Sequence, residues 1–366
     1  MEKSYKKYIV FIFLFMLSAV VGVGIFNYII DPFEYFRKAK YPIDYTSQDD
    51  YLLFNGLIKH YDFENVIAGS SVSMNFSLKD TEKTLNMPKV IKLGMVSSVP
   101  IETIPTLSFA LQHKPIKNIL MDLTLLLNGE KYRLPYFMLQ KYYPPINSLL
   151  YLFNISVFKK SLYYTFRFIP SIAKILKPTP FDLMFNIYNN SEIETYDSSH
   201  LYHSYKTLTD KVEKFLKDKT LKDPHFTNSK EFDEKWTFQL VSFVKEHPNI
   251  HFIFWINPSN ILYYKAFPQS SIKDILEFDM FVTRKIVAYP NVEIHDLRTM
   301  PLASSIHQYM DTGHFDLKGA HEVLEAIKSK KYLLNKNNID LFNQKLIKMI
   351  EDYQIPKEFE TFKKDK

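Results

Sequence analysis

The chain has 366 residues, a formal net charge of +6 at pH 7, 46% hydrophobic residues and 16% aromatic residues. This length and apolar content suffice for one large domain or two modest ones, and they exclude a collagen-like, low-complexity or disordered chain. Cysteine is absent, which excludes disulfides, thiol nucleophiles, thiolate metal sites and the lipidation route to a bacterial lipoprotein.

The first thirty residues predict a membrane anchor. From Tyr8 to Ile30 the chain runs for 23 residues without a charge. As a helix this run is about 34 Å long, enough to cross a hydrocarbon core of about 30 Å. Lysines precede the run and acidic residues follow it. The positive-inside rule therefore predicts residues 1–30 as a cytoplasmic tail and single-pass anchor, with the rest extracytoplasmic, that is, periplasmic or extracellular. A cleaved signal peptide is the alternative, disfavoured by the length of the run and the lack of an A-x-A-like site.

Residues 31–64 are interpreted as a juxtamembrane connector with a helix near Tyr51–His60. Beyond it, apolar strands alternate with amphipathic helices up to about residue 335, and residues 336–366 are expected to form a helical tail. This alternation predicts an α/β domain over 65–335, with a mostly parallel sheet and helices on both faces. The expected strands are Asn65–Ala68, Val90–Leu93, Asn118–Asp122, His251–Ile256 and Val292–Asp296, and the expected helices are Ile101–His113, Glu231–Glu246, Ser271–Val287 and Asp316–Lys328.

A basic, aromatic insertion at about 131–200 interrupts the alternation. Residues 131–180 contain no Asp or Glu, eight Lys or Arg and twelve Phe or Tyr. One interpretation is a helical insertion packed on the domain with solvated lysines. The other is a surface that lies on anionic lipid or against a membrane partner. Nucleic acid is not expected as a partner, because the anchor places this surface outside the cytoplasm.

The segment "NVIAGSSVSMNF" ends a strand in three serines, at the edge of a parallel sheet where loops carry the chemistry. Ser71 is the favoured nucleophile, because Ser70 should still be leaving the strand and Ser73 should lie inside the first helical turn. A serine needs a base, usually a histidine oriented by a carboxylate. In "YMDTGHFDLKG", Asp311 precedes His314 by three residues and could orient its ring. The alternative is an Asp–His pair that only caps the helix expected after Asp316.

Two other Asp–His pairs could be confused with this one. Asp197 and His200 of "YDSSH" have the same spacing, but they lie in or beside the insertion and no glycine follows them. His295 and Asp296 end a strand and could line the crevice, although adjacent residues point to opposite faces, so core packing or a turn is favoured. The motifs G-x-x-x-x-G-K-[ST], G-x-G-x-x-G and H-E-x-x-H are absent, and neither a cofactor nor a metal is predicted.

The order of these blocks points to a family. An α/β-hydrolase would place G-x-S-x-G after several strands, whereas "IAGSSV" follows the first strand and "DTGHFDLKG" precedes a late helix. In this order the chain resembles the SGNH (GDSL-like) hydrolase superfamily, with Ser71 in the nucleophile position and Ser70 replacing the usual aspartate. The resemblance implies a flavodoxin-like three-layer fold, a triad of Ser71, His314 and Asp311, and a backbone oxyanion donor at Gly94 of "IKLGMVSS".

The third block departs from the family pattern. It normally supplies an asparagine as an oxyanion donor, whereas this chain has "LMDLTLLLNG" with Thr124 near that place. The layout resembles the membrane-anchored proteins of D-alanyl-lipoteichoic acid and alginate-type O-acylation, which act beside a membrane-bound O-acyltransferase. This implies acyl transfer, most simply O-acetylation, to a cell-surface polysaccharide. The alternatives are a stand-alone carbohydrate or lipid esterase and a catalytically inactive, membrane-tethered scaffold of a surface-glycan assembly.

Overall fold

The computed structural model describes residues 2–40, 50–95, 98, 100–123, 144–166, 229–265, 269–305, 308–309 and 312–354. The chain divides into two compact units, each considered by itself. The N-terminal unit comprises Met1–Asp62 and Leu134–Tyr188, and the sheet unit comprises Phe63–Arg133 and Asn189–Lys366. Most of the basic insertion is therefore grouped with the N-terminal segment, while the domain boundaries expected from the sequence stay a prediction.

The sheet unit is built on five parallel strands among the described residues, in the order β2-β1-β3-β4-β5. The predicted α/β fold is confirmed, and each expected strand is found within one residue of its bounds. Strands β1 to β4 are almost wholly buried, as strands covered on both faces must be, and β5 is buried over its last three residues. They are β1 (Asn65–Gly69), β2 (Val90–Gly94), β3 (Asn118–Asp122), β4 (His251–Ile256) and β5 (Val292–Asp296).

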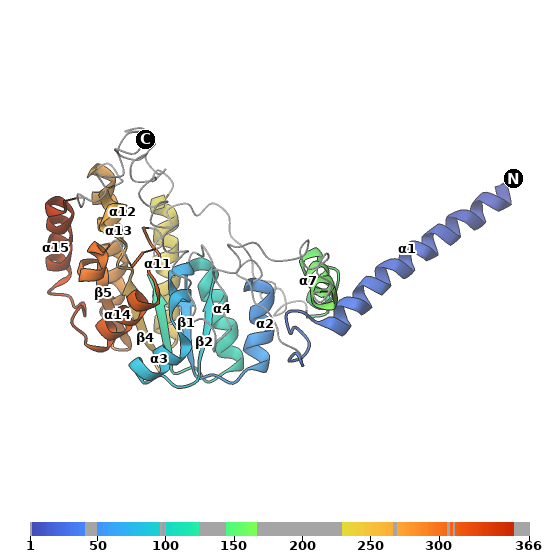
Figure 1. The fold of residues 1–366 in the computed structure, drawn as a ribbon, viewed down its shortest axis with the longest axis horizontal. Coiled ribbons are helices and arrows are strands. Elements are labelled where there is room, and N and C mark those ends of the chain that lie inside the picture. The colour runs from blue at the N-terminus through green and yellow to red at the C-terminus, as the bar shows by residue number, and fades with distance from the viewer. Residues whose placement is uncertain are drawn as a thin grey trace. The chain divides into compact units, whose positions relative to one another are not determined.

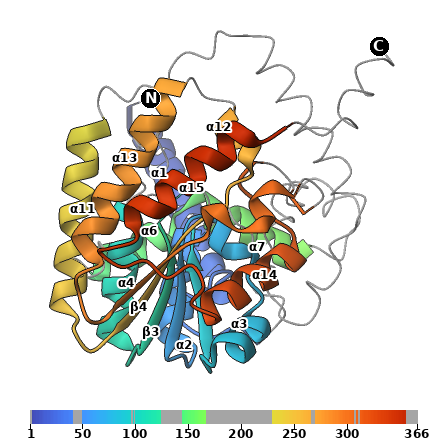
Figure 2. The ribbon, with the colours of Figure 1, turned by 90° about the vertical axis from the view of Figure 1, so that its left-hand side faces the viewer.

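Right-handed crossovers assign the helices to the two faces. The connection from β1 to β2, which contains α3, runs along the sheet in one direction. The later connections, which contain α4, α11 and α13, run in the opposite direction, so α3 lies on the face opposite these three helices. The packing agrees, because α3 contacts α14 while α11 contacts α4 and α13. In Figure 2 the sheet lies between α11 and α13 on one side and α3 and α14 on the other. These helices are α3 (Leu78–Leu85), α4 (Pro100–His113), α11 (Ser229–Glu246), α13 (Gln269–Ile286) and α14 (Leu317–Lys328). Two further helices, α12 (Ile261–Lys265) and α15 (Ile339–Asp352), contact each other.

Short 3-10 turns follow two of the strands at the carboxyl edge of the sheet. The turn η2 (Ser71–Asn75) follows β1, while η4 (Leu297–Thr299) and η5 (Pro301–Ser304) follow β5. At the end of η2, Phe76 belongs to a buried aromatic cluster with Trp255 and Phe315, whose ring centroids are 5.1 to 6.4 Å apart. Phe76 directly follows η2, Trp255 belongs to β4 and Phe315 lies in the segment before α14, so the three rings hold distant parts of the chain together.

The N-terminal unit contains α1 (Glu2–Ile30), α2 (Asp50–His60), α6 (Pro144–Leu152) and α7 (Ile155–Phe166) (Figure 1). Within α1, Tyr5–Ile30 is long and apolar enough for a signal anchor or a signal sequence. Asp31 ends this helix in the left-handed region, at φ 49°, and its carboxylate accepts hydrogen bonds from the backbone of Tyr35, Phe36 and Arg37 and from the Tyr151 hydroxyl.

Candidate functional site

Ser70 and the turn η2, together the serine turn, follow a glycine that another residue could replace only with strain. Gly69 ends β1 with φ at +115°, a conformation that side chains rarely adopt. A Cβ at this position would also collide with the carboxylate of Asp122. The glycine of "AGSS" therefore allows β1 to turn sharply and lets a carboxylate from the neighbouring strand approach the backbone.

Asp122 ends β3, the strand beside β1, and holds Ser70. Its Oδ1 accepts the Ser70 N–H at 2.7 Å and its Oδ2 accepts the Ser70 hydroxyl at 2.8 Å, in a buried site. Sequence reasoning did not find this residue. The sequence signal that could have indicated it is its position at the carboxyl end of a strand, because neighbouring parallel strands end at the same edge of a sheet. Ser70, at the position where the resemblance leads one to expect an aspartate, thus binds an aspartate from another strand.

The three serines have different partners. The Ser73 hydroxyl is fully buried and donates to the Ser70 carbonyl at 2.7 Å. The Ser70 hydroxyl donates to the Asp122 carboxylate. The Ser71 hydroxyl lies 2.8 Å from Nε2 of His314, a residue 243 positions away in the chain, and Ser71 keeps 9% of its surface exposed. The arrangement therefore brings together the two residues that the sequence paired across the length of the domain.

Three asparagines hold the segment that carries His314. The Asn257 side chain donates to the Gly313 carbonyl at 3.0 Å, and the Asn75 side chain donates to the Phe315 carbonyl at 2.9 Å. The backbone N–H of Asn260 donates to the Thr312 carbonyl at 2.8 Å. Sequence reasoning missed these residues too. Asn257 directly follows β4, so it lies at the same carboxyl edge as the serine turn.

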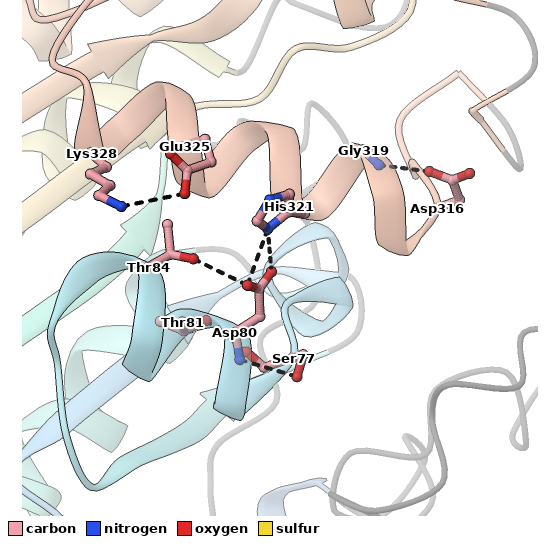
Figure 3. Close-up of polar contacts among 9 residues, drawn as sticks. All are labelled: Ser77, Asp80, Thr81, Thr84, Asp316, Gly319, His321, Glu325 and Lys328. Carbon is pink, nitrogen blue, oxygen red and sulfur yellow. Dashed lines mark hydrogen bonds and ion pairs between the residues drawn. The ribbon is translucent and has the colours of Figure 1, made fainter.

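The segment after His314 is fixed by the start of α14 (Figure 3). As predicted, Asp316 caps this helix, because its Oδ1 accepts the Gly319 N–H at 2.7 Å. Burial raises the pKa of the Asp316 carboxyl above its ordinary value. A Cβ on Gly319 would lie 2.9 Å from the Cβ of Phe315. Glycine therefore lets the first turn of the helix pack closely on the residue that follows His314.

Further along, α14 contacts α3, the helix that packs beside it on the same face of the sheet. His321 Nδ1 is 3.0 Å from the Asp80 carboxylate of α3, and Ser77 caps α3 by accepting the Asp80 N–H (Figure 3). This pair is exposed, so it contributes little to stability by itself. It joins the helix after the serine turn to the helix after His314.

Gly94 lies at the carboxyl edge beside the serine turn, paired in register with Gly69. The N–H of the next residue, Met95, donates to the Gly69 carbonyl. Alternate residues of a parallel strand direct their N–H groups to opposite sides, so the Gly94 N–H points away from β1. Its role as an oxyanion donor stays a prediction. Thr124 and Asp311 lie outside the described residues, as do the alternative pair Asp197 and His200.

The other alternative pair, His295 and Asp296, is buried and makes structural contacts. His295 is fully buried and lies 3.5 Å from Glu293, and burial lowers its pKa to about 4. Asp296 forms a buried ion pair with Arg298 at 2.7 Å, and Arg298 also donates to Asn343 of α15. Both residues therefore hold the end of β5. Among the described parts of the chain, no group of three or more His, Asp or Glu side chains could hold a metal ion.

Comparisons with known proteins leave the family open. No protein-family model matches the chain, and searches among curated proteins and among solved structures gave no significant match. The parallel five-stranded α/β sheet is compatible with SGNH-like folds.

Proposed function

We propose that this protein is a membrane-anchored, extracytoplasmic serine acyltransferase of the SGNH type, which O-acylates a cell-surface polysaccharide through an acyl-serine at Ser71. The observation that carries the proposal is the 2.8 Å contact between Ser71 Oγ and His314 Nε2. It joins a strand-end serine to a histidine at the geometry of a nucleophile and its base. The segment long and apolar enough for an anchor, Tyr5–Ile30, supports the extracytoplasmic location.

In the proposed reaction, Ser71 Oγ attacks the acyl carbonyl while His314 Nε2 takes the hydroxyl proton. The tetrahedral intermediate collapses, and its leaving oxygen departs with the proton from His314, which leaves the acyl-serine. A sugar hydroxyl then attacks this ester and gives its proton to His314, and the returning proton regenerates Ser71. Asp311 is the proposed partner of the imidazole.

Stabilisation of the oxyanion is assigned to backbone groups. The Ser71 N–H begins a 3-10 turn, where the first N–H groups lack acceptors within the turn. The Gly94 N–H at the end of β2 is the second proposed donor. The tight hold of Asp122 on Ser70 supports this assignment, because it fixes the backbone immediately before the nucleophile.

Labelling with a fluorophosphonate tests the nucleophile. The full-length chain in detergent should be labelled at Ser71, and Ser71→Ala and His314→Ala should lose the label. The matched control is Ser329→Ala, which removes an exposed hydroxyl at the end of α14 and should label like the wild type. Undiminished labelling of Ser71→Ala would refute the assignment, and absence of any label on the folded wild type would favour the inactive scaffold.

The acceptor is tested separately. An acyl-serine formed from an activated acetyl ester should be discharged faster when a polysaccharide with free hydroxyls is present than in buffer alone. Equal rates would assign the protein to ester hydrolysis, since water would then be the acceptor.

A further inference from the structure

The α6–α7 hairpin presents large apolar side chains that stay substantially exposed. Ile146, Leu149, Leu150 and Phe153 follow one helical stripe, and Ile155 continues it at the start of α7. These five side chains are 42% to 63% exposed. A contiguous apolar stripe of this kind is unusual on a water-exposed surface and indicates an interaction site.

The turn of this hairpin packs on the last two turns of α1, where α7 lies beside the helix (Figure 1). The ring of Phe153 lies so close to Gly24 that a Cβ there would be 2.9 Å from it. The Asn27 side chain donates to the Leu152 carbonyl at 2.7 Å, and Phe26 makes an edge contact with Phe158. The described side chains of α1 before Val23 are exposed, so the hairpin covers only the C-terminal end of the helix.

These contacts fix the position of the hairpin along the apolar segment of α1, and so its expected depth in the bilayer. Gly24 lies 16 residues beyond Tyr8, about 24 Å along a helix. A hydrocarbon core is about 30 Å thick, so a helix that enters it at Tyr8 still has Gly24 inside its outer margin. Asn27 lies about 28 Å along the helix from Tyr8, near the outer edge of the core, and its side-chain N–H donates to the last carbonyl of α6.

The exposed residues of α7 change in character with distance from the turn. Ile155 is apolar, Lys159 one turn later is basic, and Thr165 near the end of the helix is polar, and all three are exposed. Residues 144–166 contain no Asp or Glu. This order matches a passage from acyl chains through anionic headgroups to water.

We propose that the α6–α7 hairpin is inserted in the outer leaflet beside α1, with its apolar stripe in contact with lipid. The inference rests on the proposed membrane anchor and extends it. The hairpin also contacts the end of the anchor, because the Tyr151 hydroxyl of α6 donates to the Asp31 carboxylate. The occupant of the stripe is lipid, because Phe153 of the stripe packs on Gly24 of the anchor, where Val21 and Ile25 are exposed apolar side chains of the same helix.

The cysteine-free chain allows the depth of each position to be measured. Single substitutions Phe13→Cys, Leu149→Cys, Ile155→Cys and Thr165→Cys are made in the full-length protein and labelled with an environment-sensitive fluorophore. The proteins are reconstituted in vesicles of phosphatidylcholine and phosphatidylglycerol. Quenching by nitroxides on the lipid chains is compared with quenching by iodide in the water. All four positions are exposed, so the substitutions leave the packing of the unit intact.

The labels at Leu149 and Ile155 are expected to lose most of their fluorescence to the lipid nitroxides and to resist iodide, like the label at Phe13. The label at Thr165 is the matched control and should respond to iodide. If Phe13 responds to lipid but Leu149 and Ile155 respond to iodide, the hairpin inference is wrong and the anchor stands. If Phe13 responds to iodide, the anchor itself is wrong. Shielding of Leu149 and Ile155 from both quenchers would show that protein, such as a second copy, covers the stripe, which also overturns the inference.

Discussion

Replacing Gly69 by alanine is expected to destabilise the sheet unit and to displace Ser71 at the same time. A positive φ held by a residue with a Cβ costs about 1–3 kcal/mol. The added methyl would also meet the Asp122 carboxylate, which must then move and release Ser70. Two hydrogen bonds to a charged acceptor contribute about 1.5–3 kcal/mol each, so the whole loss is about 4–9 kcal/mol. This loss is comparable with the entire stability of a typical domain, about 5–15 kcal/mol.

The effect is measured by denaturant unfolding in detergent, followed by tryptophan fluorescence. Both tryptophans, Trp236 and Trp255, belong to the sheet unit, so the signal reports on that unit alone. Gly22→Ala is the matched control, because a Cβ at Gly22 meets no atom within 4 Å. It should leave the unfolding midpoint unchanged.

A double-mutant cycle isolates the collision. Asp122→Ala alone should lose about 3–6 kcal/mol, the two hydrogen bonds to Ser70. Once those bonds are gone, Gly69→Ala adds only its backbone strain. The double variant should therefore be about as stable as Gly69→Ala alone. The reasoning would be refuted if the two losses of stability were strictly additive. It would also be refuted if Gly69→Ala had the unfolding midpoint and the fluorophosphonate labelling of the wild type.

Three further predictions concern the residues around the site. Phe315→Ala should destabilise the sheet unit by about 3–5 kcal/mol in the same unfolding assay and slow fluorophosphonate labelling, because Phe315 is fully buried against Phe76 and Trp255; normal stability would contradict its role in joining the two halves of the site. Asn257→Ala should lower the free energy of unfolding by only about 1 kcal/mol yet slow labelling measurably, since it releases the Gly313 carbonyl beside His314; an unchanged labelling rate would show that this bond does not position the histidine. His295, which faces Glu293 with Lys330 and His251 nearby, has a folded pKa lowered to about 4 from an ordinary 6.5, so the unfolded chain binds the proton more readily between these values. Its neutral form therefore stabilises the fold fully above pH 6.5, and about 3 kcal/mol of stability should be lost as the pH falls from 6.5 to 4. His295→Leu should make unfolding midpoints less dependent on pH in this range, and an unchanged slope would contradict the assignment.

The fold could be predicted largely from the sequence because its signals are local. Strands such as Asn118–Asp122 and His251–Ile256 are short apolar runs, and both were predicted with the bounds that the structure has. The helix after Asp316 carries its own capping residue and a clear apolar face. These patterns depend on a few neighbouring residues, and the folded domain keeps the local structure that they predict.

The order of the strands and the support of the site could not be predicted in this way. A strand run specifies which residues are buried, but it does not specify that β3 lies beside β1, which is what brings Asp122 to Ser70. Asn257 similarly had no local motif, because its partner, the Gly313 carbonyl, is 56 residues away. Ser71 and His314 could be paired from the sequence because the two distant blocks that carry them resemble one family pattern, whereas the side chains that hold them belong to no motif.

The most direct test of the proposal is the chemical identity of the acylated residue. The full-length protein is exposed briefly to an activated acetyl ester, quenched in acid, digested and analysed by mass spectrometry. The proposal predicts an acetyl group on Ser71 that is absent from Ser71→Ala and His314→Ala. Acetylation that is confined to other residues, or that is the same in His314→Ala as in the wild type, would contradict it.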